Sequence, residues 1–212
     1  GNGIFVTVGN LYDTSNGIIL SSPDGKTWAT IRDTTHILQD VTYGNDTFVA
    51  VGNSGTILTS SDGSNWNELP APGTTLTNVT YANGKFVAVG NSGTILTSPD
   101  GTTWTPRTYE TPNAFSGITY GDGTFVAVGE GGIILTSSDG STWTTLTVSS
   151  AIQNSTLTNV IYANGKFVTV GNSGTILTSP GGSDGTWTLR TSETTNAFSG
   201  ITYGDGTFVA VG

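Results

Sequence analysis

Short apolar runs separated by polar turns recur along this chain, without the 3.6-residue spacing of amphipathic helices. The run Phe125 to Val128 is apolar at every position, which predicts a strand buried on both faces rather than one with a solvated face. Turn residues separate the runs, and Asn83-Gly84 and Gly121-Asp122-Gly123 are signals of tight hairpins. The pattern therefore predicts an all-β chain of antiparallel strands joined by short turns.

The apolar runs belong to a repeat of about 40 residues. The phrase Phe-Val-Ala/Thr-Val-Gly begins at Phe5, Phe48, Phe86, Phe125, Phe167 and Phe208. Five tryptophans follow in step, at Trp28, Trp66, Trp104, Trp143 and Trp187. A period near 40 residues that contains only strand-like runs is typical of β-propellers.

One repeat contains four predicted strands. They are Ala114 to Tyr120, Phe125 to Val128, Ile133 to Ser137, and a strand that begins near Trp143. Four-stranded units that stack radially bury both faces of each sheet and protect the sheet edges by closure. A linear β-solenoid is the alternative, but hairpin turns between successive strands favour meanders. The predicted fold class is thus an all-β propeller of about five four-stranded antiparallel blades.

The repeat assigns residues 1–212 to a single propeller domain. The chain starts in the second strand of a repeat, at residues 1–9, and ends with an extra first and second strand at residues 197–212. We expect one blade to be closed from both termini. One second strand is then in excess, because Phe5–Gly9 and Phe208–Gly212 claim the same position. A complete ring, an excerpt of a longer array, an engineered propeller and a homo-oligomer formed through the redundant terminal strands all remain open.

The turn before each tryptophan carries a family resemblance. Ser-Ser-Asp-Gly-Ser-Thr-Trp at Ser137 to Trp143 and Ser-Pro-Asp-Gly-Thr-Thr-Trp at Ser98 to Trp104 resemble the Asp-box, Ser-x-Asp-x-Gly-x-Thr-Trp, of bacterial BNR-like propellers. That group includes sialidases, sortilin-type receptors and photosystem II assembly-factor-like proteins. Here the turn is one residue shorter, and the fifth copy carries an insertion. The resemblance implies a structural turn, with an Asp that accepts backbone hydrogen bonds and a Trp that packs between sheets. These structural positions are Asp24, Asp62, Asp100, Asp139 and Asp184, with Trp28, Trp66, Trp104, Trp143 and Trp187.

Charge and composition narrow the partners. The net charge is −9, from 6 basic and 15 acidic side chains, so a phosphate-neutralising surface for nucleic acid is not expected. No apolar run approaches the roughly 20 residues of a membrane helix, and we expect no membrane insertion. The chain has no cysteine, which rules out disulfides and thiolate metal sites. Few charges with many Thr, Ser and Asn predict an extracellular or cell-surface location.

The inventory of reactive groups argues against catalysis. His36 is the single histidine, so we expect no metal site, no cofactor and no catalytic residues. The sialidase resemblance would imply a cluster of arginines, but all three arginines follow a Trp at the outer edge of a blade. Glycoside hydrolysis needs two carboxylates, and the predicted inner strands offer only Asp40. The counterparts of Asp40 are Asn78, Gly117, Asn159 and Gly200. The chain is predicted not to be an enzyme, with glycoside hydrolysis kept as an alternative.

Binding through loops is the favoured function. We expect a non-enzymatic extracellular recognition or adhesion propeller that binds glycan or protein where loops break the repeat. The candidate ligand-binding residues are Tyr12, Asp13, Arg107, Tyr109, Glu110, Arg190 and Glu193. Solvated loops that drifted after duplication are the competing interpretation. A structural repeat segment of a surface assembly, or an engineered propeller without a ligand, is the alternative function.

Overall fold

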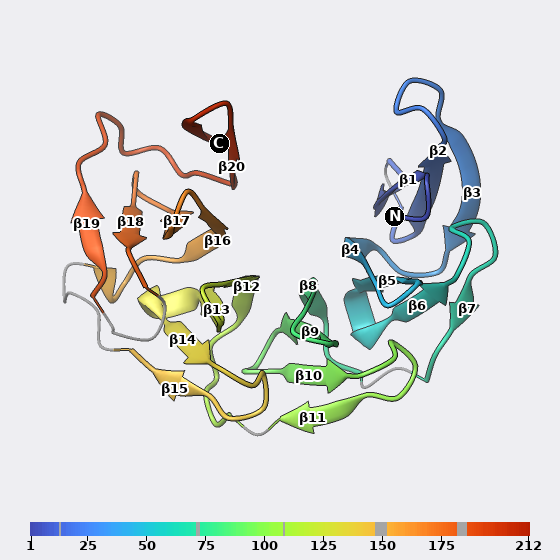
Figure 1. Ribbon diagram of the computed structural model, residues 1–212, viewed down its shortest axis with the longest axis horizontal. Helices are drawn as coiled ribbons and strands as arrows, with labels where there is room; N and C mark the ends of the chain where they lie inside the picture. Colours follow the sequence, from blue (N-terminus) through green and yellow to red (C-terminus); the bar gives the residue numbers. More distant parts are fainter. Residues whose placement is uncertain (13, 71–72, 108, 147–151, 182–185) are drawn as a thin grey trace. The chain divides into compact units, whose positions relative to one another are not determined.

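The computed structural model describes residues 1–12, 14–70, 73–107, 109–146, 152–181 and 186–212. The regular structure of these ranges is almost entirely antiparallel strands, to which the 3-10 turns η1 and η2 are added (Figure 1). The chain divides into two compact units, Gly1–Thr108 and Tyr109–Gly212.

The first unit contains three sheets, which we call blades A, B and C. Blade A has the order β1 (Phe5–Asn10), β2 (Gly17–Ser22), β3 (Ala29–Thr34). Blade B has the order β4 (Leu38–Gly44), β5 (Thr47–Gly52), β6 (Ile57–Ser60), β7 (Asn67–Glu68), with the 3-10 turn η1 (Asn53–Gly55) before β6. Blade C has the order β8 (Leu76–Ala82), β9 (Lys85–Gly90), β10 (Ile95–Ser98), β11 (Thr105–Arg107).

The second unit contains blades D, E and F. Blade D has the order β12 (Phe115–Gly121), β13 (Thr124–Gly129), β14 (Ile134–Ser137), β15 (Thr144–Thr145), with η2 (Glu130–Gly132) before β14. Blade E has the order β16 (Leu157–Ala163), β17 (Lys166–Gly171), β18 (Ile176–Ser179), β19 (Thr188–Arg190). Blade F is the hairpin β20 (Gly200–Gly204) and β21 (Thr207–Val211). The sheets confirm the predicted all-β propeller of about five blades, and the strands expected to share one blade lie in blades A and F.

Tight turns set the register inside each blade. Asn83 and Gly84 both have positive φ, 49° and 74°, as a type I′ turn requires, and they join β8 to β9. The first strand of every four-stranded blade also has an irregularity near its start, which in β4 falls between Leu38 and Asp40. Such a bulge adds one residue and re-aims the side chains that follow it.

Within each unit, neighbouring blades pack face to face through apolar side chains. Phe48 and Leu58 of blade B share one buried cluster with Ile19 of blade A. Val49 and Ile57, on the other face of blade B, share a second cluster with blade C. In the second unit blades D and E pack in the same way. This arrangement explains the uninterrupted apolar second strands, since each full burial of a Val or Phe stabilises the fold by about 1.5–3 kcal/mol.

Candidate functional site

Three blades carry a pocket at the same position of the repeat, beside the start of the second strand. The blade C pocket, about 240 Å³, is lined by Gly84, Lys85, Thr97, Ser98, Pro99 and Arg107. The blade E pocket, about 490 Å³, is lined by Gly165, Lys166, Thr178, Ser179, Pro180, Thr186, Thr188 and Arg190. The blade D pocket, about 300 Å³, is lined by Thr124, Thr136, Ser137, Ser138, Thr142, Thr144 and Leu146.

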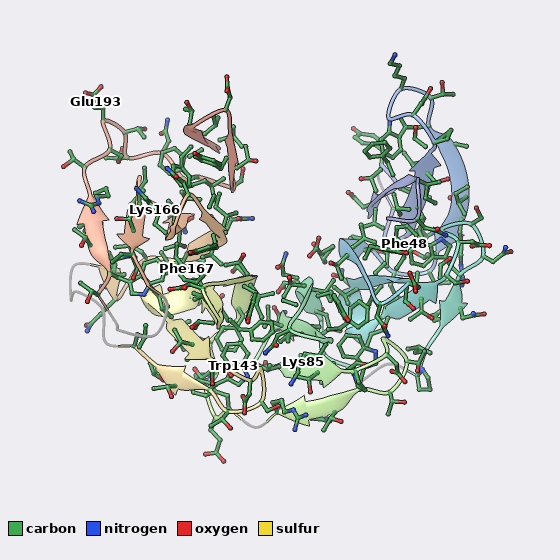
Figure 2. The ribbon with its side chains drawn as sticks, in the orientation of Figure 1. Phe48, Lys85, Trp143, Lys166, Phe167 and Glu193 are labelled. Atoms are coloured by element: carbon green, nitrogen blue, oxygen red, sulfur yellow. The ribbon has the colours of Figure 1, made fainter. Side chains whose placement is uncertain are left out.

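Strand register brings a lysine and an arginine to one face of blades C and E. In blade C, Arg107 of β11 lies opposite Ile95 of β10, and Thr97 lies opposite Val87 of β9. Because alternate residues of a strand share a face, Lys85, Thr97 and Arg107 project from the same side of the sheet. Blade E repeats the arrangement with Lys166, Thr178 and Arg190. Figure 2 labels the two lysines, Lys85 and Lys166. Blade D has Thr124 and Leu146 at these places, so only alternate blades are basic.

A threonine holds each of these arginines in place. The Nε–H of Arg107 donates to Oγ1 of Thr97, and the Nε–H of Arg190 donates to Oγ1 of Thr178, both at 2.8 Å. This bond uses one of the five N–H donors of a guanidinium group. Within the part of the chain that the structure describes, neither arginine has a carboxylate within salt-bridge distance.

Arg32 shows what a structural arginine looks like at the corresponding place in blade A. It lies opposite Ile19, as Arg107 lies opposite Ile95. Its Nη1 donates to the carbonyl oxygen of Trp66 at 2.8 Å, and its Nη2 pairs with Glu68 Oε2 at 3.2 Å. Arg32 therefore links blade A to blade B, and its charge is compensated. In the repeat that follows Arg107, Thr145 stands at the position of Glu68.

The two basic pockets hold most of the positive charge of an acidic protein. The sequence has 6 basic residues and a net charge of −9. Four of the six are Lys85, Arg107, Lys166 and Arg190. A guanidinium fork beside an ammonium group matches a carboxylate in charge and geometry. Hydroxyl groups of Thr97, Ser98, Thr178 and Ser179 line the two pockets beside these cations.

The loop candidates Tyr109 and Glu110 do not join these pockets. The hydroxyl of Tyr109 hydrogen-bonds Thr145 Oγ1, and its ring packs against Phe115 at 6.2 Å between centroids. Glu110 is exposed in the connection before β12. Both belong to the second unit, whereas Arg107 lies in the first. Their grouping into one ligand site remains a prediction.

The other predicted residues are dispersed. Tyr12 is 95% exposed in the connection between β1 and β2, and Asp13 lies outside the described residues. Glu193 is exposed after β19, whereas Arg190, like Arg107, lines a pocket together with a lysine. Sequence reasoning missed Lys85 and Lys166. The sequence does contain a pattern that points to these lysines. Each is the first residue of the second strand in a repeat whose fourth strand carries an arginine.

In the Ser-x-Asp-Gly turns, one oxygen of each aspartate carboxylate accepts several hydrogen bonds. Oδ1 of Asp100 accepts the backbone N–H groups of Thr102 and Thr103, both at 2.8 Å, and the hydroxyl of Ser98 at 3.0 Å. These bonds, that of Thr103 first, lower the pKa of Asp100 to about 2. Trp104 Nε1 donates to the carbonyl oxygen of Gly101 at 2.9 Å. The same bonds recur around Asp24, Asp62 and Asp139, while Asp184 lies outside the described residues.

Asp40 is the one carboxylate of an inner strand whose pKa moves the other way. Burial raises the pKa of Asp40 to about 6, against the opposing effect of the Val79 and Val41 backbone N–H groups. No cluster of three or more His, Asp or Glu suited to a metal ion occurs in the described ranges. None of the helical segments there is long and apolar enough to cross a membrane.

A family model places the chain among known proteins. The model described as the DUF6242 beta propeller domain matches residues 39–147, just over half of the chain. The chain belongs to this DUF6242 propeller family. No curated protein matches this DUF6242 propeller in sequence.

Solved structures share the propeller fold at low identity. YCF48 from Cyanidioschyzon merolae is 18% identical, with a TM-score of 0.66 over 92% of this chain and 71% of its own. YCF48 bound to D1 peptide is 19% identical, with a TM-score of 0.69 over 99% of this chain and 79% of its own. Virginiamycin B lyase from Staphylococcus aureus is 16% identical, with a TM-score of 0.78 over 98% of this chain and 82% of its own. By title, one neighbour binds a peptide and another is a lyase, so the fold alone does not decide the activity of the DUF6242 propeller.

The comparisons correct the predicted location. The extracellular or cell-surface assignment was wrong: two of the similar solved structures are YCF48, which is not an extracellular protein. A high content of Thr, Ser, Asn and Gly follows from the strands and tight turns of the DUF6242 propeller itself. The composition therefore carries information about the fold and not about the compartment.

Proposed function

We propose that this propeller is a non-enzymatic interaction domain that binds acidic segments of a protein partner through the Lys/Arg pockets of blades C and E. The observation that carries the proposal is the repeated pairing of Lys85 with Arg107 and of Lys166 with Arg190 on one sheet face. A guanidinium group that a threonine already orients loses little freedom when it binds a carboxylate. A similar propeller fold is known in complex with a peptide, in YCF48 bound to D1 peptide.

Protein is preferred to glycan as the partner because of the charge and chemistry of the pockets. Four cations in two pockets select anions, whereas a glycan site is typically built on an open aromatic face. Tyr12 is open but lines neither basic pocket, and the Tyr109 hydroxyl is engaged with Thr145. The Asp-box resemblance enters the proposal in a structural role only: the aspartates organise turns, and ligand binding falls to the neighbouring lysines and arginines.

Fluorescence anisotropy with defined peptides tests this function. The probe is a labelled Gly-Ser peptide with two Glu residues, and its control is the same peptide with Gln. We expect the Glu peptide to bind and the Gln peptide to bind at least tenfold more weakly, since a hydrogen bond to a charged group contributes about 1.5–3 kcal/mol. Binding should weaken with salt.

Pocket variants locate the binding. Lys85→Gln with Arg107→Gln removes the blade C pocket, and Lys166→Gln with Arg190→Gln removes the blade E pocket. The control is Lys26→Gln, an exposed cation in the turn between β2 and β3, outside both pockets. We expect each pair to halve the number of bound peptides and the four changes together to abolish binding. Undiminished binding by the fourfold variant would refute the proposal.

Glycoside hydrolysis is tested separately. A panel of chromogenic glycosides should show no turnover above buffer, because Asp40 has no second carboxylate among its inner-strand counterparts Asn78, Gly117, Asn159 and Gly200. Turnover that Asp40→Asn abolishes would show that the domain is an enzyme.

A further inference from the structure

An apolar cavity adjoins the basic pocket of blade E within the second unit. The cavity, about 240 Å³, is lined by Lys166, Val168, Ile176, Thr178, Ile201, Phe208 and Ala210. Lys166 and Thr178 also line the basic pocket. Lys166 and Thr178 therefore form a wall that the basic pocket and the apolar cavity share. One ligand can occupy both.

The shared wall follows from strand register. Val168 lies opposite Thr178, and Ile176 lies opposite Arg190, so these side chains project from one face of blade E. Lys166 precedes Val168 by two residues and projects from that same face. Lys166 lines both the cavity and the basic pocket, which suits a side chain that has an apolar stem and a charged end. Ile201, Phe208 and Ala210 of the hairpin β20–β21 complete the cavity.

The side chains on this face are more exposed to solvent in blade E than in blades C and D. Ile95 and Thr97 of blade C are 1% and 3% exposed, and Ile134 and Thr136 of blade D are similarly buried. Their counterparts in blade E, Ile176 and Thr178, are only partly buried. An apolar side chain of a ligand can therefore reach this face in blade E, whereas in blade C the equivalent positions already lie in the protein interior.

We infer that blade E recognises a pair of neighbouring residues in the partner, an acidic residue followed or preceded by a large apolar one. This inference rests on the proposed function. Arg190 and Lys166 hold the carboxylate, and the apolar side chain fills the cavity against Val168, Ile176 and Phe208. Blade C binds the acidic residue only, without a contact to an apolar neighbour. The partner class is thus a protein segment with an acidic-apolar motif.

Four labelled peptides separate the two recesses. They carry Glu-Leu, Glu-Ser, Gln-Leu or Gln-Ser at the centre of one Gly-Ser sequence. Binding is measured in the Lys85→Gln, Arg107→Gln background, in which blade E is the remaining basic pocket. We expect Glu-Leu to bind at least tenfold more tightly than Glu-Ser, because binding removes the apolar Leu side chain from water. In the Lys166→Gln, Arg190→Gln background, Glu-Leu and Glu-Ser should bind equally.

Variants of the cavity test whether the preference arises there. Ala210→Leu fills the cavity and should remove the preference for Leu while Glu-Ser binding persists. Ile201→Thr makes the cavity wall more polar and should weaken the preference for Leu severalfold. It is an independent test of the cavity if Ala210→Leu disturbs the hairpin β20–β21. Circular dichroism checks the fold of each variant.

The outcomes distinguish this inference from the function on which it rests. Equal binding of Glu-Leu and Glu-Ser would overturn the acidic-apolar motif and leave acidic recognition intact. A preference for Leu that survives both cavity variants would place the apolar contact elsewhere and would also overturn it. If no Glu peptide binds to any variant, the proposed function itself is wrong.

Discussion

Asp40 of blade B accepts a hydrogen bond across the blade interface from the backbone N–H of Val79 in blade C. The Oδ2 to N distance is 2.9 Å. Burial raises the pKa of Asp40 to about 6. At neutral pH the acceptor of this hydrogen bond is therefore an ionised carboxylate, a form that the buried surroundings disfavour. Asn78 and Asn159 occupy the corresponding positions in blades C and E without that charge.

Asp40→Asn should stabilise the protein at neutral pH. The folded-state pKa of Asp40 lies above its ordinary value of 3.8, so the folded state binds more protons between pH 4 and 6. The stability of the wild type then falls as pH rises through that window. Asn keeps an oxygen acceptor for Val79 without the charge. Since one pKa unit corresponds to about 1.4 kcal/mol, we expect a gain of about 1–3 kcal/mol at pH 7.5 and a much smaller one at pH 3.5.

Urea unfolding at the two pH values measures this difference. Asn78→Asp is the matched control, because it places a carboxylate at the same position of the next blade and should lower stability at pH 7.5. Equal stability of Asp40→Asn and the wild type at both pH values would show that the carboxylate is solvated and not strained.

Blade D offers a test by gain of function. Thr136 of blade D stands where Thr97 and Thr178 hold arginines in blades C and E. Thr124→Lys with Leu146→Arg should therefore make the existing blade D pocket basic and able to bind the acidic peptide. Calorimetric titration should rise from two to three equivalents of the Glu peptide. The control, Thr124→Gln with Leu146→Gln, should remain at two, and a stoichiometry of two in the Lys/Arg variant would count against the pocket as the binding unit.

Two tryptophans test the structural role of the turns. Trp66 is 8% exposed and Trp28 is 41% exposed, yet both donate Nε1–H to the glycine carbonyl of their turn. Trp66→Phe should destabilise the protein by about 1–3 kcal/mol, because it leaves a buried carbonyl without its donor. Trp28→Phe should cost a few tenths of that, since water replaces the lost donor. Thermal unfolding measures both, and equal losses would contradict the structural interpretation.

Sequence periodicity predicted the fold well because each second strand must bury both faces. The expected strand Phe125 to Val128 is the centre of β13, Thr124–Gly129, and Ile133 to Ser137 corresponds to β14, Ile134–Ser137. Repeat counting does not establish which terminal strands pair. β1 lies in a sheet with β2 and β3, and β20 pairs with β21. Closure of one blade from both termini stays a prediction.

The basic pockets could be predicted only in part. Arg107 and Arg190 stood out because they occupy matching places in the repeat. Their partners Lys85 and Lys166 lie more than 20 residues earlier in the sequence, and only the pairing of β9 with β10 and of β10 with β11 brings Lys85 to Arg107. The difference between Arg32 and the other arginines depends on Glu68, which sits on the following blade. The pairing of Lys85 with Arg107 depends on strand register, and the ion pair of Arg32 depends on the adjacent blade. The repeat period of the sequence specifies neither.

The three arginines provide the most direct test of the central claim, that Lys/Arg pockets bind acidic protein segments. A nitrogen-15 spectrum of the arginine side chains contains three Nε–Hε signals, one each for Arg32, Arg107 and Arg190. On titration with the Glu peptide, the signals of Arg107 and Arg190 should shift and saturate, while that of Arg32, already paired with Glu68, should stay in place. Three unmoved signals, or a shift of Arg32 as large as the other two, would contradict the account.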